Sequence, residues 1–246
     1  MSLLFSIVTA SLNPGVGIKV TADCLARQLC RDFEWIIVDS STDTESKAIV
    51  ANSAEKQKGL LLSMLDTSIS SAWNIGIRSA RGMYILLLNA GDTYSDTFLE
   101  ACKTRVGNDI LLCGQPYVVS KTSEKIYKFK AEPNKLWRGM HLAHNWICVP
   151  RSAYLPDNLY KEIPFAMDYE WILRTLSYGI YKIVVLNDSK SGDGMYTLGG
   201  ISDVNYYKSL STALGIALAY HRINWLFIPV VYIGYTLKRM SYILRG

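Results

Sequence analysis

The chain has 246 residues, and half of them are hydrophobic, which is enough to bury a sizeable core in one principal domain. Its formal net charge is +5, from 26 basic and 21 acidic residues. This small, dispersed excess argues against a nucleic-acid-binding surface, but it is compatible with an anionic ligand or a lipid surface.

Four short aliphatic or β-branched runs occupy the first ninety residues, with segments of helical spacing between them. They cover residues 4–9, 35–38, 60–65 and 84–88. Each run is nearly all apolar rather than alternating, as in strands that are covered by helices on both faces. The order predicts a mainly parallel sheet, and such sheets bind ligands at the carboxyl ends of their strands.

Two helices are expected directly after the first two strands. Residues 16–30 carry Val20, Leu25 and Leu29 near helical spacing. The sequence Thr42-Asp43-Thr44-Glu45 has the spacing of a capping box, so a second helix should begin there.

The pattern changes after residue 88. Residues 109–113 predict a further strand, and residues 117–120 predict a hairpin with residues 126–130 around the polar residues 121–125. We expect this hairpin to extend the sheet in mixed sense.

A helix is expected over residues 168–178, with Gly179 suited to the position just after its last turn. A strand over residues 181–186 and a Gly-rich loop over residues 191–201 should follow.

The five cysteines are odd in number and have no zinc-site spacing, which predicts reduced core residues in a cytosolic protein. They are Cys24, Cys30, Cys102, Cys113 and Cys148. The first ten residues lack the pattern of a signal peptide, so we expect no secretion.

The C-terminal segment, residues 225–235, is apolar, contains Pro229 and Gly234, and is followed by basic residues. It is too short to span a bilayer. Its aromatic and basic residues favour a helix that lies in the membrane interface, but a helix packed on the core or across a dimer interface has a similar composition.

Two strand ends carry candidate functional side chains. Asp39 ends the second strand, where a carboxylate can accept hydrogen bonds from a base or a ribose, although an aspartate there is also ordinary turn chemistry. The strand at residues 84–88 stops at Asn89-Ala90-Gly91-Asp92. Asp92 is a candidate ligand for Mg²⁺ or Mn²⁺, which bridge carboxylates to diphosphates, and the alternative is a plain connecting turn.

Seven stretches in chain order carry a resemblance to a known family. They are FSIVTASLN at residues 5–13, WIIVDSSTD at 35–43, DTSISSAWNIGI at 66–77, ARGMY at 80–84, NAGD at 89–92, HN at 144–145 and AMDYEWILR at 166–174. Over roughly residues 4–202, the chain resembles an inverting family 2 glycosyltransferase with the GT-A fold.

The resemblance implies an α/β fold of the GT-A (Rossmann-like) type, with a mixed, mainly parallel sheet flanked by helices over residues 1–202. Residues 203–246 are then a C-terminal helical extension that either associates with a membrane or packs against protein. The residues implied in nucleotide binding are Thr9, Ser11, Asn13, Asp39, Asp66 and Asn74, with Asp39 at the base.

The family's metal-binding Asp-x-Asp region falls on residues 89–92. This implies that Asp92 holds the metal, Mn²⁺ or Mg²⁺, and that Asn89, Ala90 and Gly91 meet the donor sugar and diphosphate. Asn89 replaces the commoner aspartate, but an amide oxygen can still coordinate a cation. Gly199-Gly200-Ile201-Ser202 resembles a loop that closes near the diphosphate, which adds Ser202. Two other positions depart from the family's pattern. The turn after Asp39 is shortened, and Trp73 stands where many relatives carry arginine.

The resemblance implies that the acceptor is bound by His144, Asn145 and Trp146. It also places Asp168 at the position of the catalytic base. The chemistry needs a carboxylate there because the acceptor hydroxyl must lose its proton as it attacks the anomeric carbon, opposite the departing diphosphate. The alternatives are a helix-terminal acid for Asp168 and a structural histidine for His144. Glu170 lies two residues beyond Asp168 and should point elsewhere.

The sequence therefore predicts a metal-dependent, inverting, hexosyltransferase-like enzyme. It would move a sugar from a nucleoside diphosphate sugar to a saccharide acceptor on a membrane lipid, during cell-surface polysaccharide biosynthesis at the cytosolic face of the inner membrane. A membrane surface is an expected partner, a homodimer stays open, and nucleic acid is not expected. A nucleotidyltransferase is disfavoured because residues 11–15 carry no cation. A non-catalytic nucleotide-sugar-binding scaffold is favoured by Asn89 and Trp73 but not by Asp168.

Overall fold

Two β-sheets organise the chain, whose structure is a computed structural model that describes residues 3–65, 68–119, 126–154, 156–187, 192–197 and 204–244, with side chains up to residue 237. The larger sheet contains β1 (Phe5–Ser11), β2 (Phe33–Asp39), β3 (Leu60–Ser63), β4 (Tyr84–Leu87), β6 (Ile110–Cys113), β9 (Ile147–Pro150) and β10 (Lys182–Val185). Its order is β10-β6-β9-β4-β1-β2-β3. Strand β9 runs antiparallel to β4 and β6, whereas the other pairs are parallel. This is the predicted mixed, mainly parallel sheet.

The smaller sheet has the order β5-β11-β7-β8. Its strands are β5 (Thr93–Tyr94), β7 (Tyr117–Val119), β8 (Ile126–Lys128) and β11 (Gly194–Thr197). The α-helices are α1 (Gly17–Ala26), α2 (Thr44–Lys56), α3 (Ile69–Ser79), α4 (Phe98–Lys103), α5 (Met167–Ser177), α7 (Tyr206–Ala219) and α8 (Ile228–Leu244). Short 3-10 helices are η1 (Pro133–Arg138), η2 (His144–Trp146), η3 (Arg151–Ala153) and η4 (Trp225–Phe227).

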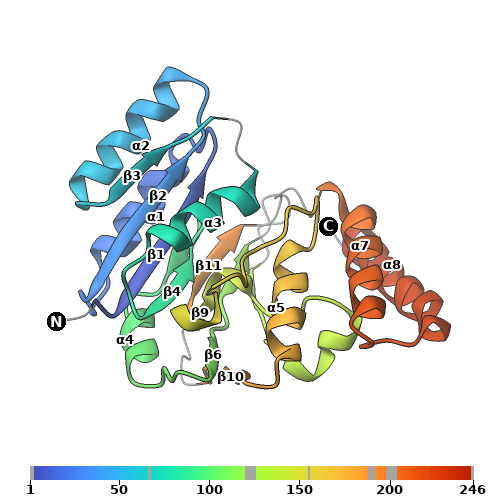
Figure 1. The fold of residues 1–246 in the computed structure, drawn as a ribbon. Helices are drawn as coiled ribbons and strands as arrows, with labels where there is room; N and C mark the ends of the chain where they lie inside the picture. Colours follow the sequence, from blue (N-terminus) through green and yellow to red (C-terminus); the bar gives the residue numbers. More distant parts are fainter. Residues whose placement is uncertain are drawn as a thin grey trace.

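Helices cover both faces of the larger sheet (Figure 1). On one face, residues such as Val8 and Ile36 pack in a core with α3, α5 and α7. On the other face, Phe5 and Ile7 pack in a second core with α1, α2 and α4. Because successive side chains of a strand point to opposite faces, a strand between two cores must be apolar at every position. This explains the continuous apolar runs of the sequence.

The start of α2 differs by one residue from the predicted capping box. Asp43, not Thr42, is the N-cap, and its Oδ1 accepts a hydrogen bond from the backbone N–H of Ser46 at 2.7 Å. Thr42 is engaged elsewhere, since its backbone N–H donates to Oδ1 of Asn13 at 2.8 Å. The loops after β1 and β2 therefore hold each other, which displaces the cap by one position.

The predicted hairpin forms, because β7 and β8 pair antiparallel with Tyr117 opposite Lys128. The expectation that it extends the larger sheet is wrong. Strand β11 pairs with β7 on one side and with β5 on the other, so the hairpin belongs to the smaller sheet. The hairpin's tip, residues 120–125, lies outside the described residues.

The predicted loop over residues 191–201 contains β11, a strand that periodicity did not reveal. Residues 191 and 198–203 lie outside the described residues. The preceding helix agrees with the prediction: α5 ends at Ser177, and Gly179 follows with φ +71°, a value that glycine adopts without strain.

All five cysteines are buried and unpaired, as predicted. Burial raises the pKa of Cys24 to about 11, so its thiol is a core group.

The C-terminal segment forms α7 and α8, joined through η4. Leu210, Leu214 and Ala217 of α7 are buried in the core that contains α5. Pro229 is the second residue of α8, where a missing backbone N–H leaves no helix bond unmade, so it does not interrupt the helix. Among the described helices, none is both long and apolar enough to cross a membrane.

Candidate active site

The carboxyl ends of β1 and β2 lie side by side, with Ser11 opposite Asp39. The carboxylate of Asp39 is buried, and its Oδ1 accepts a hydrogen bond from Ser41 Oγ at 2.7 Å. The side chain of Asn13 spans the two loops, since its Nδ2 donates to Thr42 Oγ1 at 3.1 Å. A fixed carboxylate at a strand end can receive a hydrogen bond from a ligand.

Two serine hydroxyls at this edge are buried and have no hydrogen-bond partner among the described residues. They are Ser11 Oγ and Ser40 Oγ. Buried polar atoms are normally paired, so two orphans at one sheet edge indicate that a bound polar molecule or water completes them. The sequence analysis selected Ser11 but missed Ser40, whose only signal is its position next to Asp39.

Two predicted nucleotide-binding residues have structural partners. The hydroxyl of Thr9 is fully buried and accepts a hydrogen bond from Trp35 Nε1 at 2.8 Å, so it ties β1 to β2. Both groups of the Asn74 amide bind the backbone of Tyr160, with Nδ2 donating to its carbonyl at 2.8 Å and Oδ1 accepting from its N–H at 2.9 Å. Asp66 lies outside the described residues.

Replacing Asn74 by Ala should therefore lower the stability of the protein by about 1–3 kcal/mol, because two partly buried backbone groups of Tyr160 lose their partner. Urea unfolding of the wild type and the variant measures the difference. Asn74→Asp keeps the acceptor but sets a carboxylate oxygen against the carbonyl oxygen of Tyr160, so its loss should be at least as large as that of Asn74→Ala. An Asn74→Ala protein of unchanged stability with weakened nucleotide binding would instead assign Asn74 to the ligand.

The turn at residues 89–92 is closed by a hydrogen bond from the N–H of Asp92 to the carbonyl of Asn89 at 3.1 Å. Gly91 has φ +99°, which favours glycine at the third position of such a turn. The hydroxyl of Thr21 in α1 accepts from the N–H of Gly91 at 2.9 Å and donates to the carbonyl of Asp92 at 3.0 Å. Helix α1 thus fixes the turn. Nothing in the sequence pattern distinguishes Thr21 from the other buried residues of α1.

Asp92 and Asn89 present oxygen atoms that suit a cation. Asp92 Oδ2 accepts a hydrogen bond from Asn145 Nδ2 at 2.6 Å. Burial raises the pKa of Asp92 to about 7, and the bond from Asn145 acts in the opposite direction. Asn89 Oδ1 is buried without a partner among the described residues.

A divalent cation fits this pair, since it takes carboxylate and amide oxygens and completes its shell with phosphate or water. No cluster of three or more His, Cys, Asp or Glu side chains that could hold a metal occurs within the described ranges. The protein atoms at Asn89 and Asp92 are therefore compatible with a cation shared with a diphosphate, rather than with a cage made wholly of protein ligands.

Helix η2 lies beside Asp92. Asn145 donates to Asp92, and the hydroxyl of Tyr94 donates to the carbonyl of Asn145 at 2.8 Å. Trp146 is only 2% exposed, and its Nε1 donates to the carbonyl of Asp193 at 3.1 Å. Its indole therefore has no free face for an acceptor sugar, which argues against the predicted acceptor contact. Tyr94, which the sequence analysis missed, holds η2 in position.

His144 connects η2 to the neighbourhood of α5. Its Nε2 lies 2.8 Å from the hydroxyl of Tyr160, and its ring centroid lies 5.0 Å from that of Trp73. Burial lowers the pKa of His144, whereas the carboxylate of Asp168 acts to raise it. Trp73 Nε1 is buried and has no partner in the described part of the chain. Burial thus disfavours the cationic form of His144, which lies within electrostatic reach of Asp168.

Asp168 is the second residue of α5 and is partly buried. Its Oδ1 accepts a hydrogen bond from the N–H of Tyr169 at 2.8 Å. Glu170 points elsewhere, as expected: it is buried and binds Lys161 Nζ at 2.8 Å and Arg174 Nε at 3.0 Å. Asp168 is therefore the carboxylate of this first turn that can meet a substrate. Ser202 lies outside the described residues.

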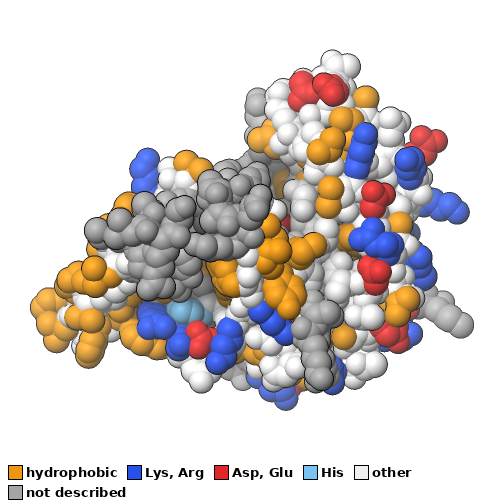
Figure 2. Space-filling model, turned by 180° about the vertical axis from the view of Figure 1, so that it is seen from behind, with side chains coloured by type: hydrophobic (Ala, Val, Ile, Leu, Met, Phe, Trp, Pro, Cys, Tyr) orange, Lys and Arg blue, Asp and Glu red, His pale blue; other side chains and the backbone are white. Residues whose placement is uncertain are grey.

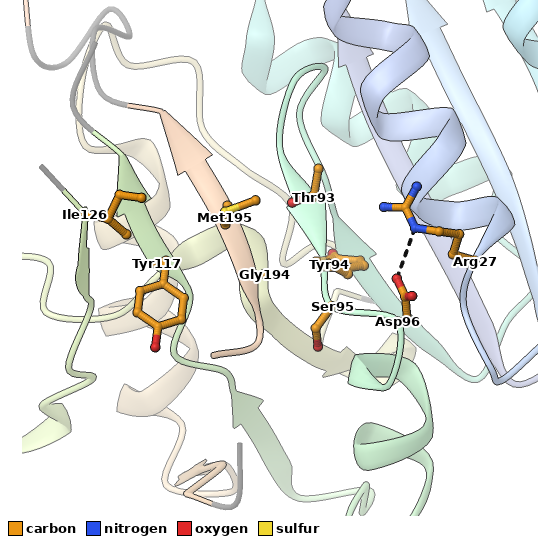
Figure 3. A pocket seen from close by; sticks show the side chains of 9 residues that line it. All are labelled: Arg27, Thr93, Tyr94, Ser95, Asp96, Tyr117, Ile126, Gly194 and Met195. Atoms are coloured by element: carbon orange, nitrogen blue, oxygen red, sulfur yellow. Dashed lines mark hydrogen bonds and ion pairs between the residues drawn. The ribbon is translucent and has the colours of Figure 1, made fainter. Parts of the chain in front are cut away.

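A separate cavity of about 450 Å³ opens between the smaller sheet and α1 (Figure 3). Its lining residues are Arg27, Thr93, Tyr94, Ser95, Asp96, Tyr117, Ile126, Gly194 and Met195. Arg27 and Asp96 form an exposed ion pair there, with Nε and Oδ1 at 3.2 Å. None of the predicted site residues that the structure describes lines this cavity.

Residues 6–181 match the family model for glycosyl transferase family 2. The chain is 33% identical over 100 residues to the amylovoran biosynthesis glycosyltransferase AmsB of Erwinia amylovora. The matched stretch covers 39% of this chain and 33% of AmsB. It is 33% identical over 92 residues to a PGL/p-HBAD biosynthesis glycosyltransferase of Mycobacterium bovis. That match covers 37% of this chain and 36% of the relative. The matches span about a third of the length of these curated relatives.

Solved structures with a similar fold include S. aureus TarS 1-349 in complex with UDP-GlcNAc, with a TM-score of 0.66, 12% identity and coverage of 97% of this chain and 73% of that one. The mannosyltransferase PcManGT from Pyrobaculum calidifontis, in complex with GDP-Man and Mn²⁺, has a TM-score of 0.64 and 15% identity, with coverage of 93% and 68%. At these identities the likeness concerns the fold alone. It agrees with the predicted GT-A architecture.

Proposed function

The chain belongs to glycosyl transferase family 2, and we propose that it transfers one sugar from a nucleoside diphosphate sugar to a saccharide acceptor, with inversion at the anomeric carbon. The observation that carries this proposal is the position of η2. Its Asn145 binds the carboxylate of Asp92, and its neighbour His144 interacts electrostatically with Asp168. A candidate diphosphate site and a candidate base thus flank one short segment.

The donor half of the proposal rests on the ends of β1 and β2. Asp39 would accept a hydrogen bond from the base, and the orphan hydroxyls of Ser11 and Ser40 would bind polar groups of the nucleotide. Asn13 would shape the loop beside them. The complexes of TarS with UDP-GlcNAc and of PcManGT with GDP-Man are consistent with a nucleotide-sugar donor in a protein of this fold.

Asp92 and Asn89 would hold Mn²⁺ or Mg²⁺ together with the donor diphosphate, next to Ala90 and Gly91. The cation's chemistry is to neutralise charge on the leaving diphosphate. The protein's own contribution is to keep Asp92 oriented through Asn145 and to leave Asn89 Oδ1, a buried oxygen, without a partner among the described residues. The Mn²⁺ named with PcManGT supports this choice of metal.

Asp168 would act as the base. A carboxylate oxygen takes the proton of the acceptor hydroxyl while the hydroxyl oxygen bonds to the anomeric carbon, and the bond from that carbon to the diphosphate oxygen breaks. Attack from the side opposite the leaving group inverts the anomeric centre. Burial lowers the pKa of His144 and so disfavours uptake of a proton by its ring, which supports the carboxylate of Asp168 as the group that receives the proton.

The acceptor is proposed to be a saccharide on a membrane lipid, used in cell-surface polysaccharide biosynthesis at the cytosolic face of the inner membrane. The relatives are named as glycosyltransferases of amylovoran and PGL/p-HBAD biosynthesis, which supports a biosynthetic role for the transfer. Residues 1–202 would form the catalytic domain, and residues 203–246 the extension that brings it to the membrane.

The experiment that tests the proposed function is a calorimetric titration of nucleoside diphosphates and their sugars, with and without Mn²⁺, followed by a turnover assay. We expect one nucleotide to bind more tightly when Mn²⁺ is present. Binding without turnover on any saccharide acceptor would favour a non-catalytic scaffold, to which Asn89 and Trp73 point. No binding at protein concentrations that detect millimolar affinity would contradict the transferase proposal.

A further inference from the structure

Helix α8 has two apolar faces, and the protein covers one of them. Val231 is buried, and Ile228 and Tyr235 are partly buried against the core that contains α5 and α7. A surface helix of a soluble protein usually presents polar side chains on its other face. In α8, the face that points away from the core is apolar as well.

The uncovered face of α8, together with η4, forms what we call the exposed stripe, defined by six side chains that are each between 57% and 67% exposed. They are Trp225, Leu226, Phe227, Val230, Ile233 and Leu237. The three members in α8, Val230, Ile233 and Leu237, recur at intervals of three and four residues, which places them on one side of that helix. Figure 2 shows hydrophobic side chains gathered at this end of the molecule. A contiguous exposed apolar surface of this kind marks an interaction site.

The charge of this part of the chain identifies the kind of partner. From residue 204 to residue 246 the sequence contains no Asp or Glu. Its charged side chains are all basic: Lys208, Arg222, Lys238, Arg239 and Arg245. A second copy of the chain would bring like charges together, whereas an anionic lipid surface attracts them. Trp225 adds an aromatic ring of the type enriched at membrane interfaces.

We infer that the helical hairpin of α7, η4 and α8 docks on an anionic bilayer, with the exposed stripe entering the headgroup region and the basic residues meeting the lipid charges. This inference deepens the proposed function and rests on it in one respect, namely that the acceptor is carried by a membrane lipid. It names the surface that meets the membrane.

The hairpin is bonded to the acceptor side of the site. Tyr220, just after α7, donates its hydroxyl hydrogen to Glu170 Oε1 at 2.7 Å, and Glu170 lies in α5 two residues from Asp168. The hydroxyl of Tyr235 in α8 lies 2.8 Å from His141 Nε2, three residues before His144. A docked hairpin would therefore hold the proposed base and η2 close to the bilayer, where a lipid-carried saccharide is found.

Flotation with phospholipid vesicles tests the inference. The full-length protein is mixed with vesicles of phosphatidylcholine alone or with added phosphatidylglycerol, and the bound fraction is measured at low and high salt. We expect binding to the phosphatidylglycerol vesicles that weakens with salt. Val230→Ser/Ile233→Ser should reduce the partition coefficient at least about tenfold. The matched control, Leu29→Ser/Ile180→Ser, removes two similarly exposed apolar side chains outside the hairpin and should bind as the wild type does.

Arg222→Glu provides a second variant. Because Arg222 is exposed, its replacement should not disturb the fold, and a loss of binding would report on charge. It should selectively weaken binding to phosphatidylglycerol vesicles. Unchanged flotation of the stripe variant would overturn the inference, and so would light scattering that shows a wild-type dimer converted to a monomer by the same substitutions. Donor titration is run in parallel. A wild type that floats but binds no nucleotide would contradict the proposed function while leaving the docking surface intact.

Discussion

Replacing Asp168 by Asn should lower kcat for sugar transfer by roughly 10²–10⁴-fold, the usual contribution of a general base. The amide is nearly the same size and can still accept the hydrogen bond from the Tyr169 N–H, so α5 should keep its position. Because the donor is expected to bind at the ends of β1 and β2, its affinity should change little. Single-turnover transfer and donor titration on the same preparation measure the two quantities separately.

The competing interpretation of Asp168 is an acid that interacts with the helix dipole, and it predicts a different result. Such an acid contributes stability and leaves chemistry unaffected. Glu45 in the first turn of α2 is an exposed acid of that kind, so Glu45→Gln is the matched control. If Asp168→Asn changed the unfolding midpoint as Glu45→Gln does and left kcat unaltered, Asp168 would be structural.

The sequence was sufficient to predict most strands of the larger sheet because their signal is local, but it did not predict β9, which lies antiparallel between β4 and β6. A strand between two cores is apolar at most positions, and residues 35–38 of β2 and 84–87 of β4 show this directly. The order of motifs then indicated the fold, which the solved structures support. The smaller sheet was not predicted as a unit, because β5 and β11 are short and pair with residues far away in the sequence.

The supports of the candidate site could not be predicted for the same reason. Thr21 holds the turn at Gly91, and Tyr94 holds Asn145, over separations of 70 and 51 residues. Neither contact leaves a periodic or compositional trace. Trp146 shows a different limit: the resemblance implies a ligand contact, and the sequence alone does not show that its indole is 2% exposed in the fold.

Replacing Asp92 by Asn should remove the metal-dependent part of donor binding, with an affinity loss of at least about 100-fold in the presence of Mn²⁺. The amide oxygen of the variant can still accept from Asn145, so the turn should persist, but the negative charge that attracts the cation is gone. Asp96→Asn, in an exposed ion pair with Arg27, removes a nearby carboxylate and should bind the donor as the wild type does. Isothermal titration with and without Mn²⁺ gives both numbers.

The pH dependence follows from the same side chain. Burial raises the pKa of Asp92 from 3.8 to about 7, so below pH 7 a cation must displace a proton from the folded protein. Metal-dependent affinity should therefore fall about tenfold per pH unit below 7. Without a cation the sign for stability is the reverse: the folded state binds a proton that the unfolded chain releases, so the Asp92 contribution becomes less favourable as pH rises from about 4 to 7.

Thermal unfolding in a chelator between pH 5 and pH 8 measures that contribution. Asp92→Asn should flatten the wild-type decline across this window, and added Mn²⁺ should offset the decline in the wild type alone. Both effects have one cause, which is that a buried carboxylate lacking a nearby positive charge is more stable with either a proton or a cation bound. If the variant kept the wild-type pH profile and its response to Mn²⁺, the cation would have to bind away from the turn at residues 89–92.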